Sequence, residues 1–228
     1  MGEVPLIVPV AEGDGDEAAL PVLLRRLAVD LGLGLRFGSA YNAHGRGNLI
    51  REGGLERFLR TAAMERDCAG ILVLLDAEGP CGVPVGRDLA RRASGLALTM
   101  PVAVVAAVPM YEAWFLASLP SIAGHRIKGQ PGLVEGASLG GVNAEAIRDP
   151  KGCADRHLAG RRKDHEPSDQ PAFTARMDLC LVMASCRSFR RLAHAVGQLA
   201  EMACAPQRGW VSNRCEAGHR TVAAGVVW

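Results

Sequence analysis

One apolar run of the sequence ends in two carboxylates that could bind a metal ion. Residues 71–75 read Ile-Leu-Val-Leu-Leu, and Asp76 and Glu78 follow directly. Five consecutive aliphatic residues are typical of a strand that is buried on both faces of a sheet. Only one residue separates the two carboxylates, so both can point to the same side of a tight turn, from which Gly79 permits a sharp exit. Hard divalent ions such as Mg²⁺ prefer carboxylate oxygens, which makes this turn a candidate metal site.

Two further carboxylates follow apolar runs in the same way. Glu12 comes directly after residues 5–11, and Glu112 comes shortly after residues 101–108. The carboxyl ends of parallel strands lie at one edge of a sheet, where ligands bind. Carboxylates gathered there repel one another unless a cation intervenes. We therefore expect four metal ligands, in a geometry suited to one or two ions bound to a phosphodiester: Glu12, Asp76, Glu78 and Glu112.

Each acidic segment also has an ordinary explanation when it is taken alone. The segment 12–17, Glu-Gly-Asp-Gly-Asp-Glu, could be an acidic loop at the N-terminus of a helix, because acidic residues favour that position. The segment 76–79 could be a simple turn. Glu112 could lie in the first turn of a helix without any chemical role. The combination of the three segments at one edge favours a site.

The elements that must position these residues alternate between strands and helices. We expect strands at 5–11, 34–41, 70–75 and 101–108. Helices should lie between them, around 18–31, 55–63 and 86–97, and the first should begin near 18–20 because Pro21 fits only a first turn. Short connections between such elements favour a parallel sheet with helices on both faces, which is a Rossmann-like α/β fold. A flavodoxin-like order, with the first and third strands adjacent, would place Glu12 beside Asp76.

The pattern changes after this α/β core, which we place at residues 1–119. Residues 111–119 predict a helix that buries Tyr111, Trp114, Phe115 and Leu119. Residues 120–203 predict an extension packed on the core, with loops up to 171 and helices at 171–185 and 188–202. Residues 204–228 have little periodicity, which favours a loose tail.

Composition and charge exclude some classes of protein. The 228 residues carry a net charge of +2, so no global basic field indicates a nucleic-acid partner. No apolar stretch approaches the roughly 20 residues of a membrane span, and residues 1–10 lack the basic start of a secretory signal. The seven cysteines are scattered without a Cys-x-x-Cys pair, which indicates reduced thiols. We therefore expect a cytoplasmic protein without a membrane partner.

A glycine-rich loop offers a candidate contact for phosphate. Arg46 lies between Gly45 and Gly47. Its guanidinium and the neighbouring backbone amides could bind a phosphate of a nucleic acid. No Gly-Lys-Ser/Thr follows, so the loop is not a Walker motif, and an ordinary strand-to-helix connection is the alternative.

Three segments together resemble a known family. Val10–Leu24 (VAEGDGDEAALPVLL), Leu72–Gly79 (LVLLDAEG) and Tyr111–Ala117 (YEAWFLA) resemble the Toprim-like domain of a bacterial family related to the nuclease part of the overcoming-lysogenization-defect (OLD) proteins. The resemblance covers roughly residues 5–195. It implies a Toprim-like, Rossmann-like central sheet with a helical C-terminal extension.

The resemblance also implies roles for individual residues. Glu12 would be a metal ligand or general acid/base, and Asp76 and Glu78 would match the Asp-x-Asp pair that binds Mg²⁺. Glu112 would match an additional acidic position, and Lys151 would stabilise the charge that develops on the phosphate, although a plain surface lysine is the alternative. The sequence departs from the family at Glu78, which is one methylene longer than aspartate, and at Pro80, where a further acidic residue is usual.

The function implied is a phosphodiesterase that depends on Mg²⁺ or Mn²⁺. The resemblance favours a DNA or RNA nuclease that works with an AAA- or ABC-type ATPase in phage defence, with a homodimer as a candidate assembly. The two departures support an alternative, a non-catalytic scaffold subunit of such an ATPase complex. A nucleotide- or flavin-binding protein is less favoured, because no Gly-x-Gly-x-x-Gly follows the first strand and an acidic edge repels phosphates.

Overall fold

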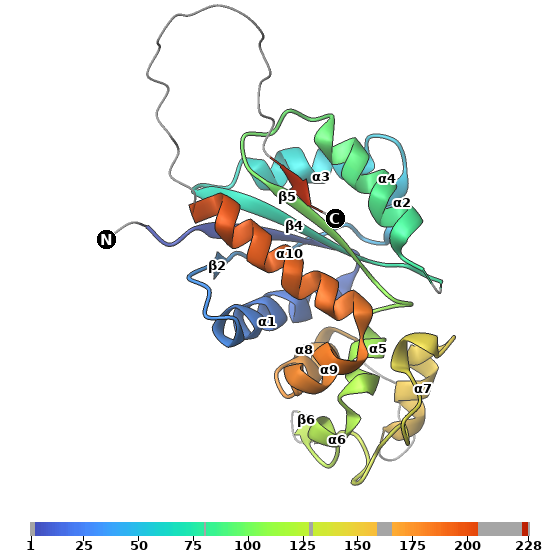
Figure 1. Ribbon diagram of the computed structural model, residues 1–228. Coiled ribbons are helices and arrows are strands. Elements are labelled where there is room, and N and C mark those ends of the chain that lie inside the picture. The colour runs from blue at the N-terminus through green and yellow to red at the C-terminus, as the bar shows by residue number, and fades with distance from the viewer. Residues whose placement is uncertain (1–2, 80, 128–129, 159–165, 205–224, 228) are drawn as a thin grey trace, which may run out of the picture.

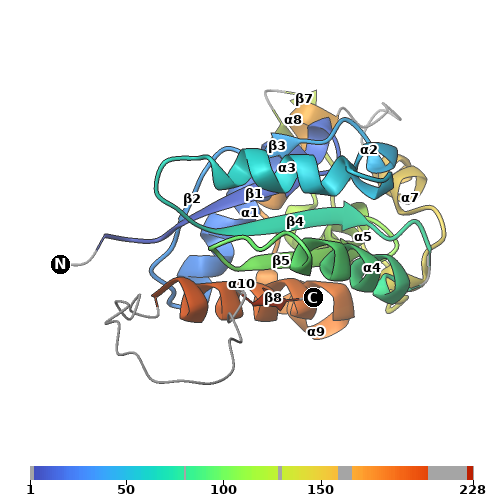
Figure 2. The same cartoon turned by 90° about the horizontal axis from the view of Figure 1, so that it is seen from above.

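A parallel sheet with helices on both faces forms the core of the protein (Figures 1 and 2). The computed structural model describes residues 3–79, 81–127, 130–158, 166–204 and 225–227. The sheet has the order β2-β1-β4-β5-β8, β3 also pairs with β1, and every pairing is parallel. Its strands are β1 (Leu6–Ala11), β2 (Arg36–Phe37), β3 (Tyr41–Asn42), β4 (Cys68–Asp76), β5 (Val102–Ala107) and β8 (Val226–Val227). This arrangement confirms the expected Rossmann-like α/β fold.

The order of the strands brings β1 and β4 side by side. Val10 pairs with Val73, and Asp76 at the end of β4 pairs with Ala107 at the end of β5. The expected adjacency of the first and third predicted strands is therefore confirmed. As a result, the segments that follow β1, β4 and β5 leave the sheet at one edge.

The second predicted strand, 34–41, is interrupted in the structure. It forms β2 and β3, and residues 38–40 between them leave the ladder. The backbone N–H of Gly38 still donates to the Ile7 carbonyl. Alternate residues of β1 face this neighbouring segment, so Pro9 would have to supply the next N–H donor. Proline has no N–H, and the ladder breaks there.

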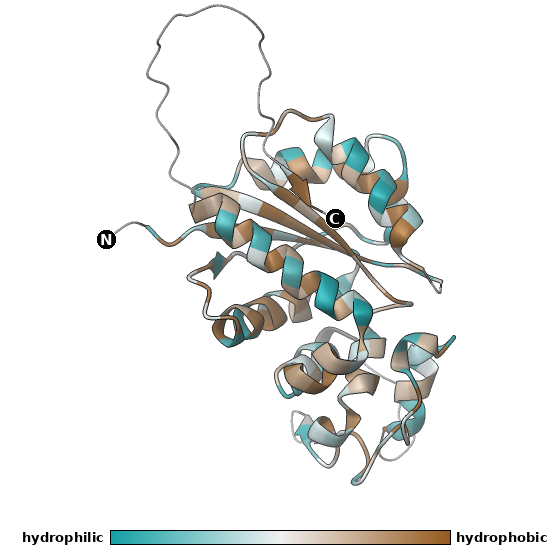
Figure 3. Ribbon diagram, in the orientation of Figure 1, coloured by the Kyte–Doolittle hydropathy of each residue, from teal (hydrophilic) through white to brown (hydrophobic). Residues whose placement is uncertain are grey.

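Two apolar clusters fill the space between the sheet and its helices. Helices α1 (Asp14–Asp30) and α10 (Arg187–Cys204) cover one face, and α3 (Gly54–Ala63) and α4 (Val83–Ser94) cover the other, with the short α2 (Arg46–Ile50) before α3. Alternate residues of a strand serve opposite faces: Leu72 and Leu74 pack toward α1, whereas Ile71 and Val73 pack toward α3. Figure 3 shows the apolar strands between helices with hydrophilic outer faces.

Helix α1 begins earlier than the sequence predicted. It starts at Asp14, so Pro21 lies inside the helix and not in its first turn. Asp14, Asp16 and Glu17 occupy the first turn, where negative charge stabilises the helix dipole. This stabilisation offsets the single hydrogen bond that Pro21 cannot donate. The expected start near 18–20 was wrong, and the acidic segment belongs to the helix.

The extension is a group of short helices at one end of the sheet (Figure 1). Its elements are α5 (Glu112–Ala117), α6 (Leu119–Ile122), β6 (Arg126–Ile127), β7 (Gln130–Pro131), the 3-10 helix η1 (Ala144–Ala146), α7 (Pro150–His157), α8 (Glu166–Thr174) and α9 (Leu179–Ser185). The predicted helix 171–185 is thus two helices. Asp178 causes the break, because its carboxylate accepts hydrogen bonds from the N–H groups of Cys180 and Leu181 and so starts α9.

Aromatic residues join the extension to the core. Tyr111, Trp114, Phe115 and Leu119 are all buried, as predicted. The indole N–H of Trp114 donates to Ser188 Oγ at 2.9 Å, which fixes α5 against the start of α10. The entrance of α5, where Glu112 lies, is therefore held rigidly.

The end of the chain differs in part from the predicted loose tail. Val226 and Val227 form β8, which pairs with Val102 and Ala103 of β5. Residues 205–224 and 228 of the predicted tail lie outside the described residues, as does Pro80. No helix in the described part of the chain is long and apolar enough to cross a membrane.

Candidate carboxylate site at the carboxyl edge of the sheet

Four carboxylates approach one another where β1, β4 and β5 leave the sheet. They are Glu12, Asp16, Asp76 and Glu112. Their mutual influence is electrostatic: Asp16, Glu112 and Glu12 all act to raise the pKa of Asp76. The strand order explains why residues so far apart in sequence meet here.

Glu12 spans the gap between β1 and β4. Its Oε2 accepts a hydrogen bond of 3.0 Å from the backbone N–H of Asp76. Its own carbonyl accepts a hydrogen bond of 2.8 Å from the N–H of Gly45, which fixes the glycine-rich loop beside it. Burial raises the pKa of Glu12, and the hydrogen bond from Asp76 lowers it in part. The negative charge of Glu78 raises it further.

Asp76 lies at the centre of the group. Its Oδ1 accepts a hydrogen bond of 2.9 Å from the backbone N–H of Tyr111, which ties the end of β4 to the start of α5. Burial raises the pKa of Asp76 well above its ordinary range, and the neighbouring carboxylates raise it further. When these side chains are ionised together, their negative charges repel one another. A bound cation would offset this repulsion.

Asp16 belongs to the group although it was not singled out from the sequence. Its side chain is 8% exposed, and burial, followed by the charges of Glu112 and Glu12, raises its pKa to about 7. A signal was present, because acidic residues favour the first turn of a helix and Asp16 lies in the acidic segment that closely follows β1. Misplacing the start of α1 hid this signal.

Glu112 is held by groups from the extension. It is 4% exposed, and its Oε1 accepts a hydrogen bond of 3.2 Å from Gln170 Nε2. Burial raises the pKa of Glu112, and the positive charge of Lys151 lowers it. Lys151 acts on the pKa of Asp16 in the same direction. Lys151, in the first turn of α7, is therefore close enough to act electrostatically on Glu112 and Asp16.

Gln170 was not expected from the sequence. It is 3% exposed, and its Oε1 is a buried side-chain oxygen without a hydrogen-bond partner among the described residues. Such an oxygen is costly unless something donates to it or is coordinated by it. No sequence signal identified Gln170, because only the packing of α8 brings it to Glu112.

Glu78 lies at the rim and faces Arg46. Its side chain is 59% exposed, and its Oε2 lies 3.2 Å from Arg46 Nε. Its backbone is left-handed, with a φ of 53°, and its N–H donates to the Pro109 carbonyl at 2.9 Å. Arg46 also donates through Nη1 to the carbonyl of Asp76. The loop arginine thus reaches the predicted site, but it holds the exit of β4.

The donor set of this site suits a hard divalent ion. The carboxylates of Glu12, Asp16, Asp76 and Glu112 and the unpartnered oxygen of Gln170 are all oxygen ligands of the kind that Mg²⁺ and Mn²⁺ prefer. Within the described residues, however, no group of three or more His, Cys, Asp or Glu side chains already has the arrangement of a metal site. Binding would therefore need the longer glutamate side chains to rotate toward Asp76.

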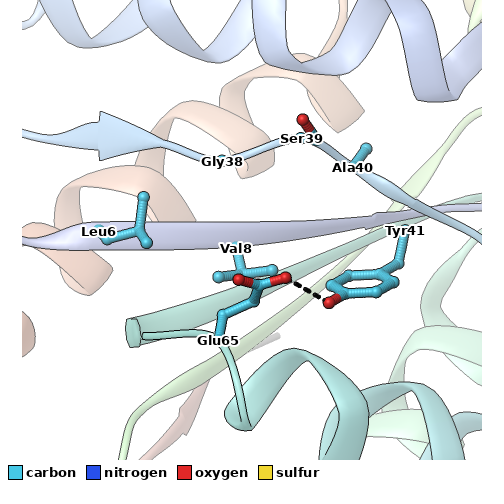
Figure 4. A pocket seen from close by; sticks show the side chains of 7 residues that line it. All are labelled: Leu6, Val8, Gly38, Ser39, Ala40, Tyr41 and Glu65. Atoms are coloured by element: carbon cyan, nitrogen blue, oxygen red, sulfur yellow. Dashed lines mark hydrogen bonds between the residues drawn. The ribbon is translucent and has the colours of Figure 1, made fainter. Parts of the chain in front are cut away.

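A separate pocket lies where the β1 ladder is interrupted (Figure 4). It has a volume of about 270 Å³ and is lined by Leu6, Val8, residues 38–41 and Glu65. Figure 4 shows the hydroxyl of Tyr41 directed at the carboxylate of Glu65, to which it donates a hydrogen bond. Glu65 is the one carboxylate among the described residues that line this pocket, whereas several carboxylates act on one another at the edge of the sheet.

Comparisons with known proteins add no assignment to these features. A scan against protein-family models, a search of curated proteins and a search of solved structures each found no match. The carboxylate site is therefore interpreted from its own geometry.

Proposed function

We propose that the protein is a phosphodiesterase that depends on Mg²⁺ or Mn²⁺ and cleaves DNA or RNA. The observation that carries the proposal is the gathering of Glu12, Asp16, Asp76 and Glu112. Burial raises all four pKa values, and the charges of Glu12 and Glu112 further raise those of Asp16 and Asp76. A divalent ion would offset this repulsion. The resemblance to the Toprim-like domain of OLD-related proteins supports the reaction class.

Each residue has a role in this proposal. A bound ion would polarise a phosphate oxygen and lower the pKa of a bound water. Asp76 and Glu12 would hold the ion, with Asp16 and Glu112 as further ligands or as its negative environment. Glu12 would orient or deprotonate the attacking water, and Lys151 would stabilise the charge that develops on the phosphate.

Glu78 and Arg46 have less direct roles. Glu78, which the sequence placed among the ligands, would reach the ion only after leaving Arg46. Arg46 would contact the nucleic-acid backbone. If it released Glu78, its guanidinium could bind a phosphate.

We further propose that an AAA- or ABC-type ATPase is the partner. The resemblance supports such a partner, since the related family acts in phage-defence systems. The net charge of +2 supports it as well, because a nearly neutral chain has little long-range attraction for a polyanion. The ATPase would then supply engagement of the nucleic acid.

The alternative is a non-catalytic scaffold subunit of such an ATPase complex. Two observations favour it. No three of the described acidic, histidine or cysteine side chains are arranged as a metal site, and Glu78 is exposed and paired with Arg46. A scaffold would bind divalent ions weakly and would keep its partner when Asp76 is replaced.

Cleavage assays with an Asp76 variant test the proposal. Supercoiled plasmid, single-stranded DNA and RNA would each be incubated with Mg²⁺, Mn²⁺ or EDTA. Asp76→Asn keeps an oxygen for the Tyr111 N–H but removes the charge, and Asp30→Asn at the exposed end of α1 is the matched control. We expect metal-dependent cleavage by the wild type and the control, and none by Asp76→Asn.

The other outcomes separate the two functions. Cleavage that survives in Asp76→Asn would refute this site. If no protein cleaves, titration calorimetry with Mn²⁺ decides: binding that is lost in Asp76→Asn supports an enzyme that needs its partner, and no binding supports the scaffold.

A further inference from the structure

The outer edge of β5 is only partly covered. Strand β8 pairs with Val102 and Ala103, and no other described strand pairs with this edge of β5. The carbonyl of Ala107 accepts a hydrogen bond from Ala77 on the β4 side. Because backbone groups alternate along a strand, the N–H and C=O of Ala106 point to the open side. An open strand edge of this kind is a template for a further strand.

A groove lies along the open edge of β5. Helices α4 and α10 lie on either side of this strand (Figure 2). The groove has a volume of about 380 Å³ and lies between the start of α4 and the start of α10. Val83, Val105 and Val108 give it apolar walls. Gly82 closes it tightly, because a Cβ there would lie 2.7 Å from the Cβ of Ala106. The space between the helices suits one extended chain.

The groove is basic on the side of α10. Arg187 and Arg191 line it, together with Glu145. The carboxylate of Glu145 already accepts hydrogen bonds from the backbone N–H groups of Arg187 and Ser188 and from Ser188 Oγ, so its charge is committed to the first turn of α10. Arg187 is exposed and Arg191 is half-buried, so both charges border the groove.

We propose that this groove binds an extended segment of a partner protein, which adds a strand to β5 beyond β8 and places an acidic side chain against Arg187 and Arg191. Two features favour this occupant. The Val-Val segment of β8 already occupies the adjacent part of the edge, so the edge accepts an apolar strand. A second copy fits less well, because α4 packs over both β5 and β8 and would meet the same helix of the copy. The inference is independent of the phosphodiesterase proposal.

Peptide binding tests the proposal directly. The probe is a set of capped, fluorescein-labelled hexapeptides with valine or isoleucine at alternate positions and glutamate at one end or the other. We expect members of the set to bind in fluorescence anisotropy and to slow hydrogen exchange of the Ala106 amide. N-methylation of the peptide amides that face β5 should abolish binding, because strand addition uses backbone hydrogen bonds.

Charge-reversal variants locate the acidic side chain. Arg187→Glu and Arg191→Glu should each weaken binding by at least about tenfold. The control Arg66→Glu, at an exposed turn before β4, should leave the affinity unchanged. Arg187 is exposed, so its variant should fold normally even if Arg191→Glu does not, and thermal melts would verify this.

Four results would overturn the proposal. They are the absence of binding across the whole peptide set, binding that survives N-methylation, binding that is unaffected in both arginine variants, and equal competition by free glutarate, which would indicate a small carboxylic acid. Protection of Ala106 that rises with protein concentration, together with a dimer in sedimentation, would assign the groove to a second copy.

Discussion

The carboxylate of Glu12 accepts a hydrogen bond from the backbone of Asp76, at 3.0 Å between Oε2 and N. The bond joins the exits of two neighbouring parallel strands, and the negative charge of Glu12 is one of the causes that raise the pKa of Asp76. Glu12 thus has a structural contact in addition to the ligand role that we propose for it. The two contributions can be separated by substitution.

Glu12→Gln and Glu12→Ala separate structure from chemistry. Glutamine keeps an oxygen for the Asp76 N–H but has no charge, so the protein should unfold at nearly the wild-type urea concentration and yet lose metal-dependent cleavage. Alanine leaves that N–H without its partner, which should cost about 1–3 kcal/mol of unfolding free energy. Equal destabilisation by both substitutions would show that the charge of Glu12, and not the hydrogen bond, matters to the fold.

Asp16 should make the metal-free protein less stable as the pH rises. Its pKa is raised to about 7 by burial and by Glu112 and Glu12, against about 4 in an unfolded chain. The folded state therefore holds a proton that the unfolded chain has lost, so stability is fully present below pH about 4 and declines until about pH 7. Asp16→Asn cannot ionise and should exceed the wild type at pH 8 by an amount on the order of a few kcal/mol.

Urea unfolding in EDTA between pH 4 and 8 measures this difference. Asp30→Asn, which removes an exposed charge at the end of the same helix, should follow the wild type at every pH. Adding Mg²⁺ at pH 8 should narrow the gap between the wild type and Asp16→Asn, because an ion that binds only the folded state stabilises it. A gap that is constant from pH 4 to pH 8 would contradict the raised pKa of Asp16.

The sequence was sufficient to predict the sheet and two of its carboxylates. Buried parallel strands are continuous aliphatic runs, and their carboxyl ends must share an edge, so the approach of Glu12 and Asp76 followed from pattern and topology. The split of the second strand was predictable in principle, because Pro9 cannot donate.

The rest of the site depends on tertiary structure or on exact helix boundaries. Asp16 was missed because Pro21 suggested a later start for α1. Gln170 has no local signal, since its contact with Glu112 requires α8 to pack beside α5. The outward position of Glu78 depends on a left-handed backbone that a sequence pattern does not encode.

Arg46 should contribute to stability because two nitrogens of its guanidinium bind different groups. Its guanidinium binds the Asp76 carbonyl and lies 3.2 Å from the carboxylate of Glu78. Arg46→Lys keeps the charge but cannot bind both groups in the same geometry, so we expect a loss of about 1–2 kcal/mol in urea unfolding. Arg51→Lys, at an exposed position before α3, should change stability by less than about 0.5 kcal/mol.

Salt dependence tests the second role of Arg46. If its charge contacts a nucleic-acid backbone, Arg46→Ala should reduce the slope of log affinity against log salt by about 1, whereas Arg46→Lys should keep it. Affinities would be measured with the Asp76→Asn protein, which should not cleave the probe. An unchanged slope in Arg46→Ala would leave Arg46 with a structural role alone.

The contacts of Arg92, between α3 and α4, depend on the planar geometry of its guanidinium. Its Nε and Nη2 bind the two carboxylate oxygens of Glu56 at 2.8 and 2.7 Å, and its Nη1 and Nη2 also donate to the carbonyls of Ile50 and Arg51. Both partners of the ion pair are largely shielded from solvent, with side-chain exposures of 14% and 18%. One planar group thus fixes the end of α2 and the start of α3 against α4.

Arg92→Lys therefore tests the geometry and not the charge. A single ammonium cannot make the paired contact with Glu56 and also reach both carbonyls. We expect a loss of about 1–3 kcal/mol of unfolding free energy. Arg91→Lys is the matched control, because Arg91 is 78% exposed and forms an ion pair of 2.8 Å with the exposed Asp88, and it should cost less than about 0.5 kcal/mol. Similar losses in both variants would show that α2 and α3 are held by apolar packing around Leu49 and Leu55, with no special contribution from Arg92.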